Sequence, residues 1–320
     1  MDSELRQRAM AIAAGAQELI DVGDLKAARR EIELVLSLLQ SFEERNSPES
    51  IFALNTLAGL AEKEGNLEQA AGIYRVALEK SANYLDNSSP AYVNGLANLA
   101  AILGKLALYE EAAALYRQAI EIGKATHGED HPSYAIRLNN LAELLSTMGR
   151  FDEAEPLYRR AIEITKATLG EDNPTYASGL NNLANLSASL GRFDEAELLY
   201  RRAIEIDKAT LGEDHPDYAT RLNNLAGLLQ ALGRTDEAEP LYRRAIEIDK
   251  AALGEDHPTY ANRLNNFAVF YAETSRFDQA IPLAERALRI CEARLPEGHP
   301  KTEEIRRSLD AMRRDQADTD

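Results

Sequence analysis

The sequence contains one cysteine and no tryptophan among its 320 residues. A single cysteine excludes a disulfide within the chain and any metal site built from several thiolates. No apolar run approaches the roughly 18 residues that a membrane-spanning helix needs. The first residues also lack the basic start and apolar block of a secretory signal. These absences lead us to expect a cytoplasmic protein without a membrane span.

Basic residues are scarce relative to acidic ones. The chain has 36 lysines and arginines against 53 aspartates and glutamates, which gives a formal net charge of −17. Nucleic acids and anionic membranes are bound mainly through lysine and arginine, so the sequence predicts neither as a partner. With 45% apolar and 28% charged residues, the composition is that of a soluble folded protein.

A repeat with a period of 42 residues runs through the chain. One series consists of Pro48, Pro90, Pro132, Pro174, Pro216, Pro258 and Pro300. A second consists of Ala28, Ala70, Ala112, Ala154, Ala196, Ala238 and Ala280. A third consists of Gly23, Gly65, Gly149, Gly191 and Gly233, with Ala107 and Ser275 in its gaps. Three independent series with one spacing exclude coincidence and point to a repeat architecture.

Each repeat reads as a helix, a turn and a second helix. In residues 132–173, the proline suits the first helical position, where a missing N–H costs nothing. The first helix carries an apolar stripe at spacings of three and four, formed by Leu138, Leu141, Ala142 and Leu145. After Gly149, the second helix has the stripe Ala154, Leu157, Tyr158, Ala161, Ile162 and Ile164. No segment of the chain has the pattern of a strand.

These positions resemble the tetratricopeptide repeat. The matching residues are Leu138, Leu141, Ala142, Leu145, Gly149, Phe151, Ala154, Tyr158 and Ala161. That repeat usually has about 34 residues, whereas this one carries an extension, for example at 209–216. The extension, and Leu-Asn-Asn-Leu-Ala at 138–142, 180–184 and 222–226, are similar to the kinesin light chain and nephrocystin-3 subclass. Bacterial proteins carry such repeats too, and we expect a bacterial source.

The resemblance implies an all-α fold: a right-handed α-solenoid of seven helix–turn–helix pairs with a C-terminal capping helix. We expect repeats at about 6–47, 48–89, 90–131, 132–173, 174–215, 216–257 and 258–299. A cap helix at 301–314 and a short acidic tail at 315–320 follow, so that 1–314 forms a single domain. The first helix ends near Gly23, too early for the coiled coil of kinesin light chains, and a motor-subunit role is not expected.

The sequence offers little for catalysis or metal binding. Four histidines, His131, His215, His257 and His299, directly precede a repeat proline. Asn173 takes that place in one repeat, which fits helix capping better than metal ligation. Cys291 suits buried apolar filling better than a nucleophile, and no phosphate loop or catalytic motif occurs. We therefore expect no enzyme activity, no metal and no cofactor.

Paired asparagines carry the functional hypothesis. They are Asn139 and Asn140, Asn181 and Asn182, Asn223 and Asn224, and Asn265 and Asn266, with Asn98 as a partial copy. An asparagine inside a helix is about 0.6 kcal/mol less favourable than alanine, so stability alone does not explain both. On a helical wheel both flank the face opposite the apolar stripe. The resemblance implies that this face, which Asn185 shares, lines a concave groove.

Two interpretations of the pairs remain open. One asparagine of each pair can join neighbouring repeats, or both can bind the backbone of an extended peptide, as the kinesin light chain resemblance implies. The wheel puts Arg137, Arg221 and Arg263 at the groove edge, where they would favour an acidic peptide. They suit equally well as partners of nearby carboxylates.

We therefore expect a non-catalytic scaffold that binds a partner protein or an extended peptide in its groove. The alternative is a structural module, either a homo-oligomer or a fixed subunit of a larger complex, whose groove is occupied by a neighbouring chain.

Overall fold

The computed structural model describes residues 7, 11–12, 14–19, 25–40, 47–84, 86–295 and 297–318. The described residues form an all-α protein, as the repeat pattern predicts, with no strand among them. Gly23, which we expect to end the first helix of the first pair, lies outside the described residues.

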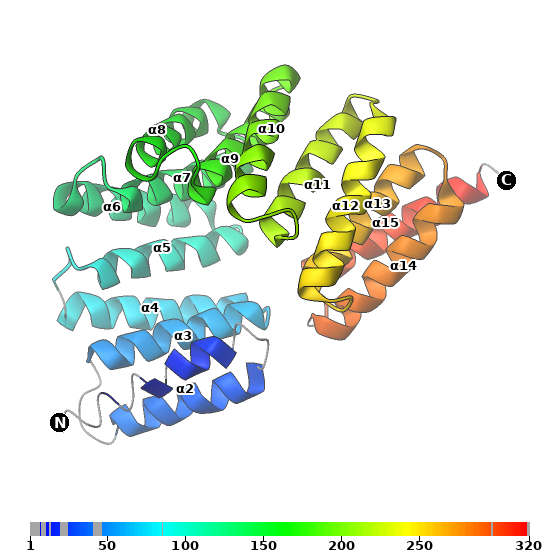
Figure 1. Ribbon diagram of the computed structural model, residues 1–320. Helices are drawn as coiled ribbons and strands as arrows, with labels where there is room; N and C mark the ends of the chain where they lie inside the picture. Colours follow the sequence, from blue (N-terminus) through cyan, green and yellow to red (C-terminus); the bar gives the residue numbers. More distant parts are fainter. Residues whose placement is uncertain are drawn as a thin grey trace. The chain divides into compact units, whose positions relative to one another are not determined.

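The chain forms two compact parts, Met1–Leu157 and Tyr158–Asp320, here called the N-terminal and C-terminal halves. The N-terminal half contains α2 (Leu25–Gln40), α3 (Pro48–Lys63), α4 (Leu67–Tyr84), α5 (Pro90–Lys105), α6 (Tyr109–His127) and α7 (Pro132–Thr147). Helix α8 (Phe151–Leu169) contains the boundary. The C-terminal half contains α9 (Pro174–Ser189), α10 (Phe193–Thr210), α11 (Pro216–Ala231), α12 (Thr235–Leu253), α13 (Pro258–Glu273), α14 (Phe277–Arg294) and α15 (Pro300–Ala317). Within each half, consecutive helices pair as hairpins (Figure 1).

The repeat prolines begin helices, as predicted, at α3, α5, α7, α9, α11, α13 and α15. The residue before each proline caps the helix with its side chain. Nδ1 of His215 accepts the backbone N–H of Asp217 at 3.1 Å, and Oδ1 of Asn173 accepts that of Thr175 at 2.8 Å. His131, His257 and His299 make the same bond. The interpretation of these histidines as helix caps is therefore confirmed.

The glycine series marks the turn inside each hairpin. Gly149, Gly191 and Gly233 have φ of 72° to 73°, in the left-handed region that glycine adopts without a steric cost. The residue after the glycine bonds back across the helix end, as in Arg150 N–H to the Leu145 carbonyl at 2.8 Å. Ala107 and Ser275 adopt the same conformation, with φ of 59° and 58°, at a cost of about 1 kcal/mol each.

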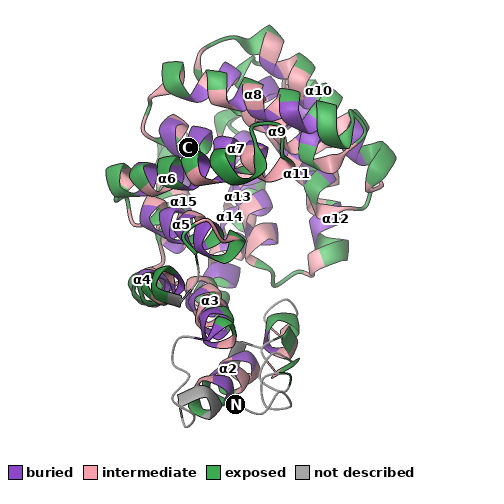
Figure 2. Ribbon diagram, turned by 90° about the vertical axis from the view of Figure 1, so that its left-hand side faces the viewer, coloured by how far each residue is buried: buried purple, intermediate pink, exposed green. Residues whose placement is uncertain are grey.

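The alanine series belongs to the buried core. Its members are all fully buried: Ala28, Ala70, Ala112, Ala154, Ala196, Ala238 and Ala280. The predicted stripe residues Leu138, Leu141 and Leu145 are also buried. Buried and exposed residues alternate along the helices in Figure 2, as expected of amphipathic helices that pack on one side.

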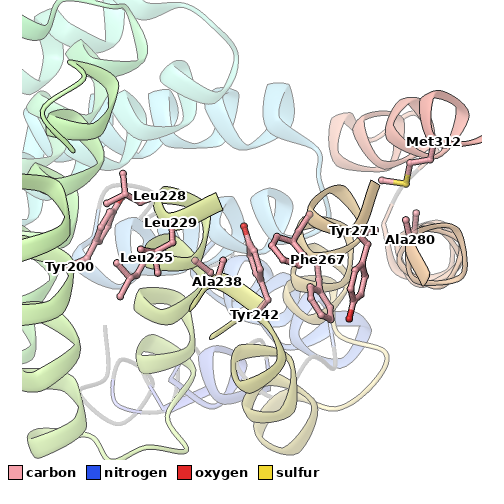
Figure 3. Packing of buried hydrophobic residues seen from close by; sticks show 14 of the residues in the cluster. Tyr200, Leu225, Leu228, Leu229, Ala238, Tyr242, Phe267, Tyr271, Ala280 and Met312 are labelled. Atoms are coloured by element: carbon pink, nitrogen blue, oxygen red, sulfur yellow. The ribbon is translucent and has the colours of Figure 1, made fainter. Parts of the chain in front are cut away.

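One apolar cluster runs through the C-terminal half from α9 to α15. Figure 3 shows Tyr200, Leu229, Tyr242 and Phe267 among its packed side chains. In α13 the leucines of earlier repeats give way to Phe267, Phe270 and Tyr271, whose rings contact one another. The rings of Phe267 and Phe270 also contact Tyr242.

Helix α15 covers the end of this cluster with Leu309 and Met312, and its Ile305 packs in a second cluster with Leu264 and Cys291. It begins at Pro300 and continues to Ala317, so the predicted end at residue 314 is too early. The Asp318 N–H closes the helix by bonding to the Arg314 carbonyl at 3.0 Å. None of the described helices is both long and apolar enough to span a membrane.

Candidate functional site

The exposed faces of the first helices form a groove in each half. The C-terminal groove has a volume of about 700 Å³ and lies over α9, α11 and α13, with contributions from α10, α12 and α15. Its lining includes Asn185, Tyr200, Asn223, Asn224, Gly227, Gln230, Tyr242, Asn265, Asn266, Val269, Glu273, Glu304 and Ser308. The N-terminal groove, of about 420 Å³, is lined by residues that include Ala101, Lys105, Tyr116, Asn140 and Glu143.

Small side chains and tyrosine hydroxyls shape the floor of the C-terminal groove. A Cβ atom at Gly227 of α11 would meet the Tyr242 hydroxyl at 3.6 Å, so the glycine leaves space directly above the tyrosine. The Tyr242 hydroxyl donates to Gln230 Oε1 at 2.7 Å, and that of Tyr200 donates to Asn185 Oδ1. Burial raises the pKa of both tyrosines well above 10, so the hydroxyls remain protonated donors.

The first asparagine of each pair in the C-terminal half is buried, contrary to our expectation that both flank an exposed face. Asn181, Asn223 and Asn265 are 4%, 7% and 5% exposed. Two of them accept from the second asparagine of the next repeat: Asn224 Nδ2 donates to Asn181 Oδ1 at 2.9 Å, and Asn266 Nδ2 donates to Asn223 Oδ1 at 3.1 Å. The helical wheel assumes a single buried direction, whereas these helices also pack against the first helices of adjacent repeats. These two contacts join consecutive repeats in the C-terminal half.

Some of these amides also face the groove. Asn185, Asn223, Asn224, Asn265 and Asn266 line the C-terminal groove, and Asn140 lines the N-terminal groove. The other predicted asparagines lie outside both linings. Asn181 donates to Asn182 at 3.3 Å, Asn98 is exposed on α5, and Asn139 is half-buried on α7.

The three arginines do not lie at the groove edge, which corrects our prediction. Arg137, Arg221 and Arg263 are only 7–8% exposed and do not belong to either lining. Arg221 Nε bonds to Asp207 Oδ2 at 3.1 Å, and Arg263 Nε bonds to Asp249 Oδ2 at 3.0 Å. The interpretation of the arginines as partners of carboxylates is therefore confirmed for Arg221 and Arg263.

The buried Arg–Asp pairs place a carboxylate in an apolar setting. Asp207 and Asp249 are fully buried, and desolvation raises the pKa of both carboxyls while the paired arginines oppose that shift. Arg137 lacks such a partner among the described residues and donates to the carbonyl and hydroxyl of Ser133. Burial lowers the pKa of its guanidinium.

Sequence reasoning missed the groove residues supplied by the second helices and the cap. Tyr200, Tyr242, Gln230, Glu273 and Glu304 were not predicted as site residues. A signal for the tyrosines exists, because Tyr74, Tyr116, Tyr158, Tyr200 and Tyr242 recur with the 42-residue spacing. Glu273 and Glu304 have no counterparts in such a series.

Two further features concern catalysis. Within the described ranges, no group of three histidine, cysteine or acidic side chains is arranged to hold a metal ion. Cys291 is fully buried, and desolvation raises the pKa of its thiol, which leaves it a poor nucleophile. The arrangement offers hydrogen-bonding groups and space for a ligand.

A family model for the tetratricopeptide repeat matches residues 92–167, 138–209, 175–251 and 221–293. The chain belongs to the tetratricopeptide repeat family. Tetratricopeptide repeat proteins bind other proteins or peptides, and their fold is generally a non-catalytic interaction scaffold. No curated protein sequence matches the chain.

Three solved structures share the fold. BtubC (BKLC) from P. vanneervenii is 24% identical, with a TM-score of 0.55 over 79% of this chain and 94% of that one. Nearly identical TPR-like repeats of a putative kinesin light chain from Podosopora anserina are also 24% identical, with a TM-score of 0.53 over 64% and 97%. A Rap protein complexed with Competence and Sporulation Factor is 13% identical, with a TM-score of 0.59 over 98% and 100%. At these identities the similarity concerns the fold.

Proposed function

We propose that this protein is a non-catalytic scaffold that binds an extended segment of a partner protein in the C-terminal groove. The observation that carries the proposal is the composition of this groove. Amide groups of Asn224, Asn266 and Gln230 lie beside the open space above Gly227. Amides offer both donors and acceptors, so they can meet the N–H and C=O groups of a peptide backbone.

The contact set that we propose is narrower than the one predicted from the sequence. It includes Asn185, Asn223, Asn224, Asn265 and Asn266, whose side chains line the groove. It excludes Arg221 and Arg263, because a guanidinium committed to a buried carboxylate is not free to bind a peptide. The argument for an acidic partner depended on these arginines and therefore loses its support.

We further assign the chain to the 42-residue subclass similar to kinesin light chain and nephrocystin-3. The support is the regular spacing of Pro48 to Pro300, each of which begins a helix. The single, buried Cys291 suits a reducing cytoplasm, which we propose as the compartment. A bacterial source stays a prediction.

The proposal is tested by placing a larger side chain in the groove and measuring peptide binding. Peptides are selected from a displayed library of random linear peptides and titrated against the protein by fluorescence anisotropy. Gly227→Leu places a side chain in the groove and, because leucine is the better helix former, should not destabilise α11. We expect peptide affinity to fall by tenfold or more, which corresponds to about 1.4 kcal/mol.

The matched control is Ala251→Leu, which adds a comparable side chain at an exposed position of α12 outside the groove. It should leave the affinity unchanged. The proposal would be contradicted if all selected peptides bound the Gly227→Leu variant as tightly as they bind the wild-type protein. A protein that oligomerises in sedimentation and becomes monomeric with Gly227→Leu would instead support a module whose groove holds a neighbouring chain.

A further inference from the structure

A second pocket of the C-terminal half shares no lining residue with the C-terminal groove. It has a volume of about 380 Å³ and lies between helix α14 and the turn that joins α12 to α13. Three arginines of α14, Arg286, Arg289 and Arg294, line it together with Glu255 and Asp256 of the turn. The lining of the C-terminal groove contains no lysine or arginine among the described residues. The two sites therefore differ in charge.

Two of the three arginines are held at the same turn. Arg286 pairs with Glu255, and Arg294 Nη2 bonds to Asp256 Oδ2 at 3.1 Å. The guanidinium of Arg286 also lies over the Tyr260 ring, 5.4 Å from its centroid. Because Glu255 and Asp256 are adjacent in the chain, these contacts bring both guanidinium groups to one place. Each guanidinium carries five N–H donors, so a contact with one carboxylate leaves donors for a ligand.

The third arginine, Arg289, is exposed and has no ion-pair partner among the described residues. Its acidic neighbours on α14 are turned toward α15. Glu285 pairs with Arg313 at 2.7 Å, and Glu292 pairs with Arg306 at 2.8 Å. The positive charge of Arg289 is therefore left uncompensated beside the pocket.

This excess of cations distinguishes the last turn between repeats from the two before it. The positions of Arg289 and Arg294 are held by Glu247 and Ala252 in α12, and by glutamate and threonine in α10. Lys250 pairs with the turn at 2.5 Å and completes a set of four cations and two carboxylates. The corresponding sets at the preceding turns have two cations and three carboxylates: Lys208, Arg244, Glu213, Asp214 and Glu247, and Lys166, Arg202, Glu171, Asp172 and Glu205.

We propose that this pocket, here called the arginine pocket, binds a phosphate group. The two excess positive charges match the charge of about −1.5 to −2 that a phosphate ester carries near neutral pH. Clusters of arginines recognise phosphate because the guanidinium fork donates to two oxygens at once. Glu255 and Asp256 are already bonded to cations, and the pocket volume also admits the side chain or small molecule that carries the phosphate.

The first experiment titrates the full chain with inorganic phosphate, followed by ³¹P nuclear magnetic resonance at constant ionic strength. Arg289→Glu introduces the residue type that α10 and α12 carry at this position, and thermal melting by circular dichroism establishes that it is folded. We expect phosphate affinity to fall by tenfold or more. The matched control, Arg307→Glu, makes the same charge change at an exposed position of α15 outside the pocket, and should leave the affinity nearly unchanged.

A transplant tests whether the set of cations is sufficient. Glu247→Arg with Ala252→Arg recreates the arginine pocket at the preceding turn, where Arg244 is already present. Added to Arg289→Glu, this pair of substitutions should restore most of the lost affinity. Gly227→Leu, which fills the C-terminal groove, should not alter phosphate binding.

The source of the phosphate is tested with displayed random peptides that contain one fixed phosphoserine. Peptides that bind more tightly than inorganic phosphate and depend on Arg289 would identify a phosphorylated protein segment as the ligand. Binding of inorganic phosphate without such peptides would indicate a small phosphate ester. Absence of phosphate binding by the wild-type protein, or equal losses for Arg289→Glu and Arg307→Glu, would overturn the arginine pocket and leave the proposed function standing.

Discussion

The two halves of the protein fill one equivalent site between hairpins in different ways. In the C-terminal half, the site holds the buried pairs of Arg221 with Asp207 and of Arg263 with Asp249. In the N-terminal half, Arg137 has the same place in its repeat, but the residue 14 positions earlier is Gly123. A Cβ at Gly123 would meet Arg137 Nη1 at 2.8 Å, so the glycine makes room for the guanidinium.

The same repeat geometry therefore accepts either a buried ion pair, as at Arg221 and Arg263, or a single arginine that donates to Ser133, as at Arg137. Asp207 and Asp249 compensate the charge of the arginines but are themselves desolvated, and one oxygen of each accepts no hydrogen bond among the described residues. A buried ion pair therefore contributes little net stability, while loss of one partner is costly. The C-terminal half depends on keeping both members, and the N-terminal half does not.

Removal of one member of a buried pair should give the largest effect. Asp249→Ala leaves the guanidinium of Arg263 buried without a carboxylate, which should destabilise the protein by about 3–5 kcal/mol. Arg137→Met in the N-terminal half removes a cation that has no carboxylate partner in the described structure, and should change stability by about 1 kcal/mol or less. Urea unfolding monitored by circular dichroism compares the two.

Restoring complementarity in the same site provides the control. Asp249→Leu combined with Arg263→Met should recover most of the stability that Asp249→Ala loses. Equal destabilisation by Asp249→Ala and Arg137→Met would show that the carboxylate is not what distinguishes the halves.

Acid should destabilise the C-terminal half by protonating Glu239. Glu239 accepts from Arg276 at 2.8 Å, Arg243 at 2.6 Å and Tyr271 at 3.1 Å, and these bonds lower its pKa from 4.5 to about 2. Because the pKa is lowered in the folded state, the stabilisation is present above pH 5 and is lost as the pH falls toward 2. The side chain is 25% exposed, and we expect a loss of about 1–3 kcal/mol.

Urea unfolding at pH 7 and pH 3 measures this loss. Glu239→Gln should reduce the difference between the two pH values. The matched change in the N-terminal half is Glu153→Gln, which removes an exposed carboxylate from its pair with Arg150. This variant should hardly alter the difference in stability between pH 7 and pH 3. A pH dependence that is the same in wild type and Glu239→Gln would assign the acid sensitivity to other groups.

The smallest effect is expected when the N-terminal site is given the missing acid. Gly123→Asp supplies a carboxylate beside Arg137, whose flexible end must move to admit it. Since the new ion pair offsets the cost of burying the acid, we expect stability to change by about 1 kcal/mol or less. The variant should nevertheless make Arg137→Met costly, with a coupling energy of about 0.5–3 kcal/mol in a double-mutant cycle. Gly123→Ala serves as the control, and a coupling as large with alanine would exclude an ion pair.

The sequence predicts the local structure well because the repeat prolines, alanines and glycines act through short-range effects. Pro132 begins α7, Ala196 is fully buried, and Gly149 adopts the left-handed turn, all as these residue types require. The end of α15 was less predictable, since exposed polar residues can continue a helix or fray.

The candidate site was predicted only in part because it depends on contacts between repeats. The wheel identified the face of Asn185 and Gly227, but it could not show that Asn223 accepts from Asn266. Nor could it show that Arg221 turns toward Asp207. A signal for that pair was available, because aspartate and arginine occur together at a separation of 14 residues in two repeats.

The shared chemistry of the Asp207–Arg221 and Asp249–Arg263 contacts bears on how such a chain gains and loses repeats in evolution. Loss of residues 216–257 would bring Asp207 into the place of Asp249 opposite Arg263, so the remaining contact would be of the same kind. Loss of residues 174–215 would instead put Thr165 opposite Arg221 and leave a buried guanidinium without an acid. Deletion of residues 216–257 therefore keeps the buried ion pair intact, whereas deletion of the neighbouring repeat, which has nearly the same sequence, does not.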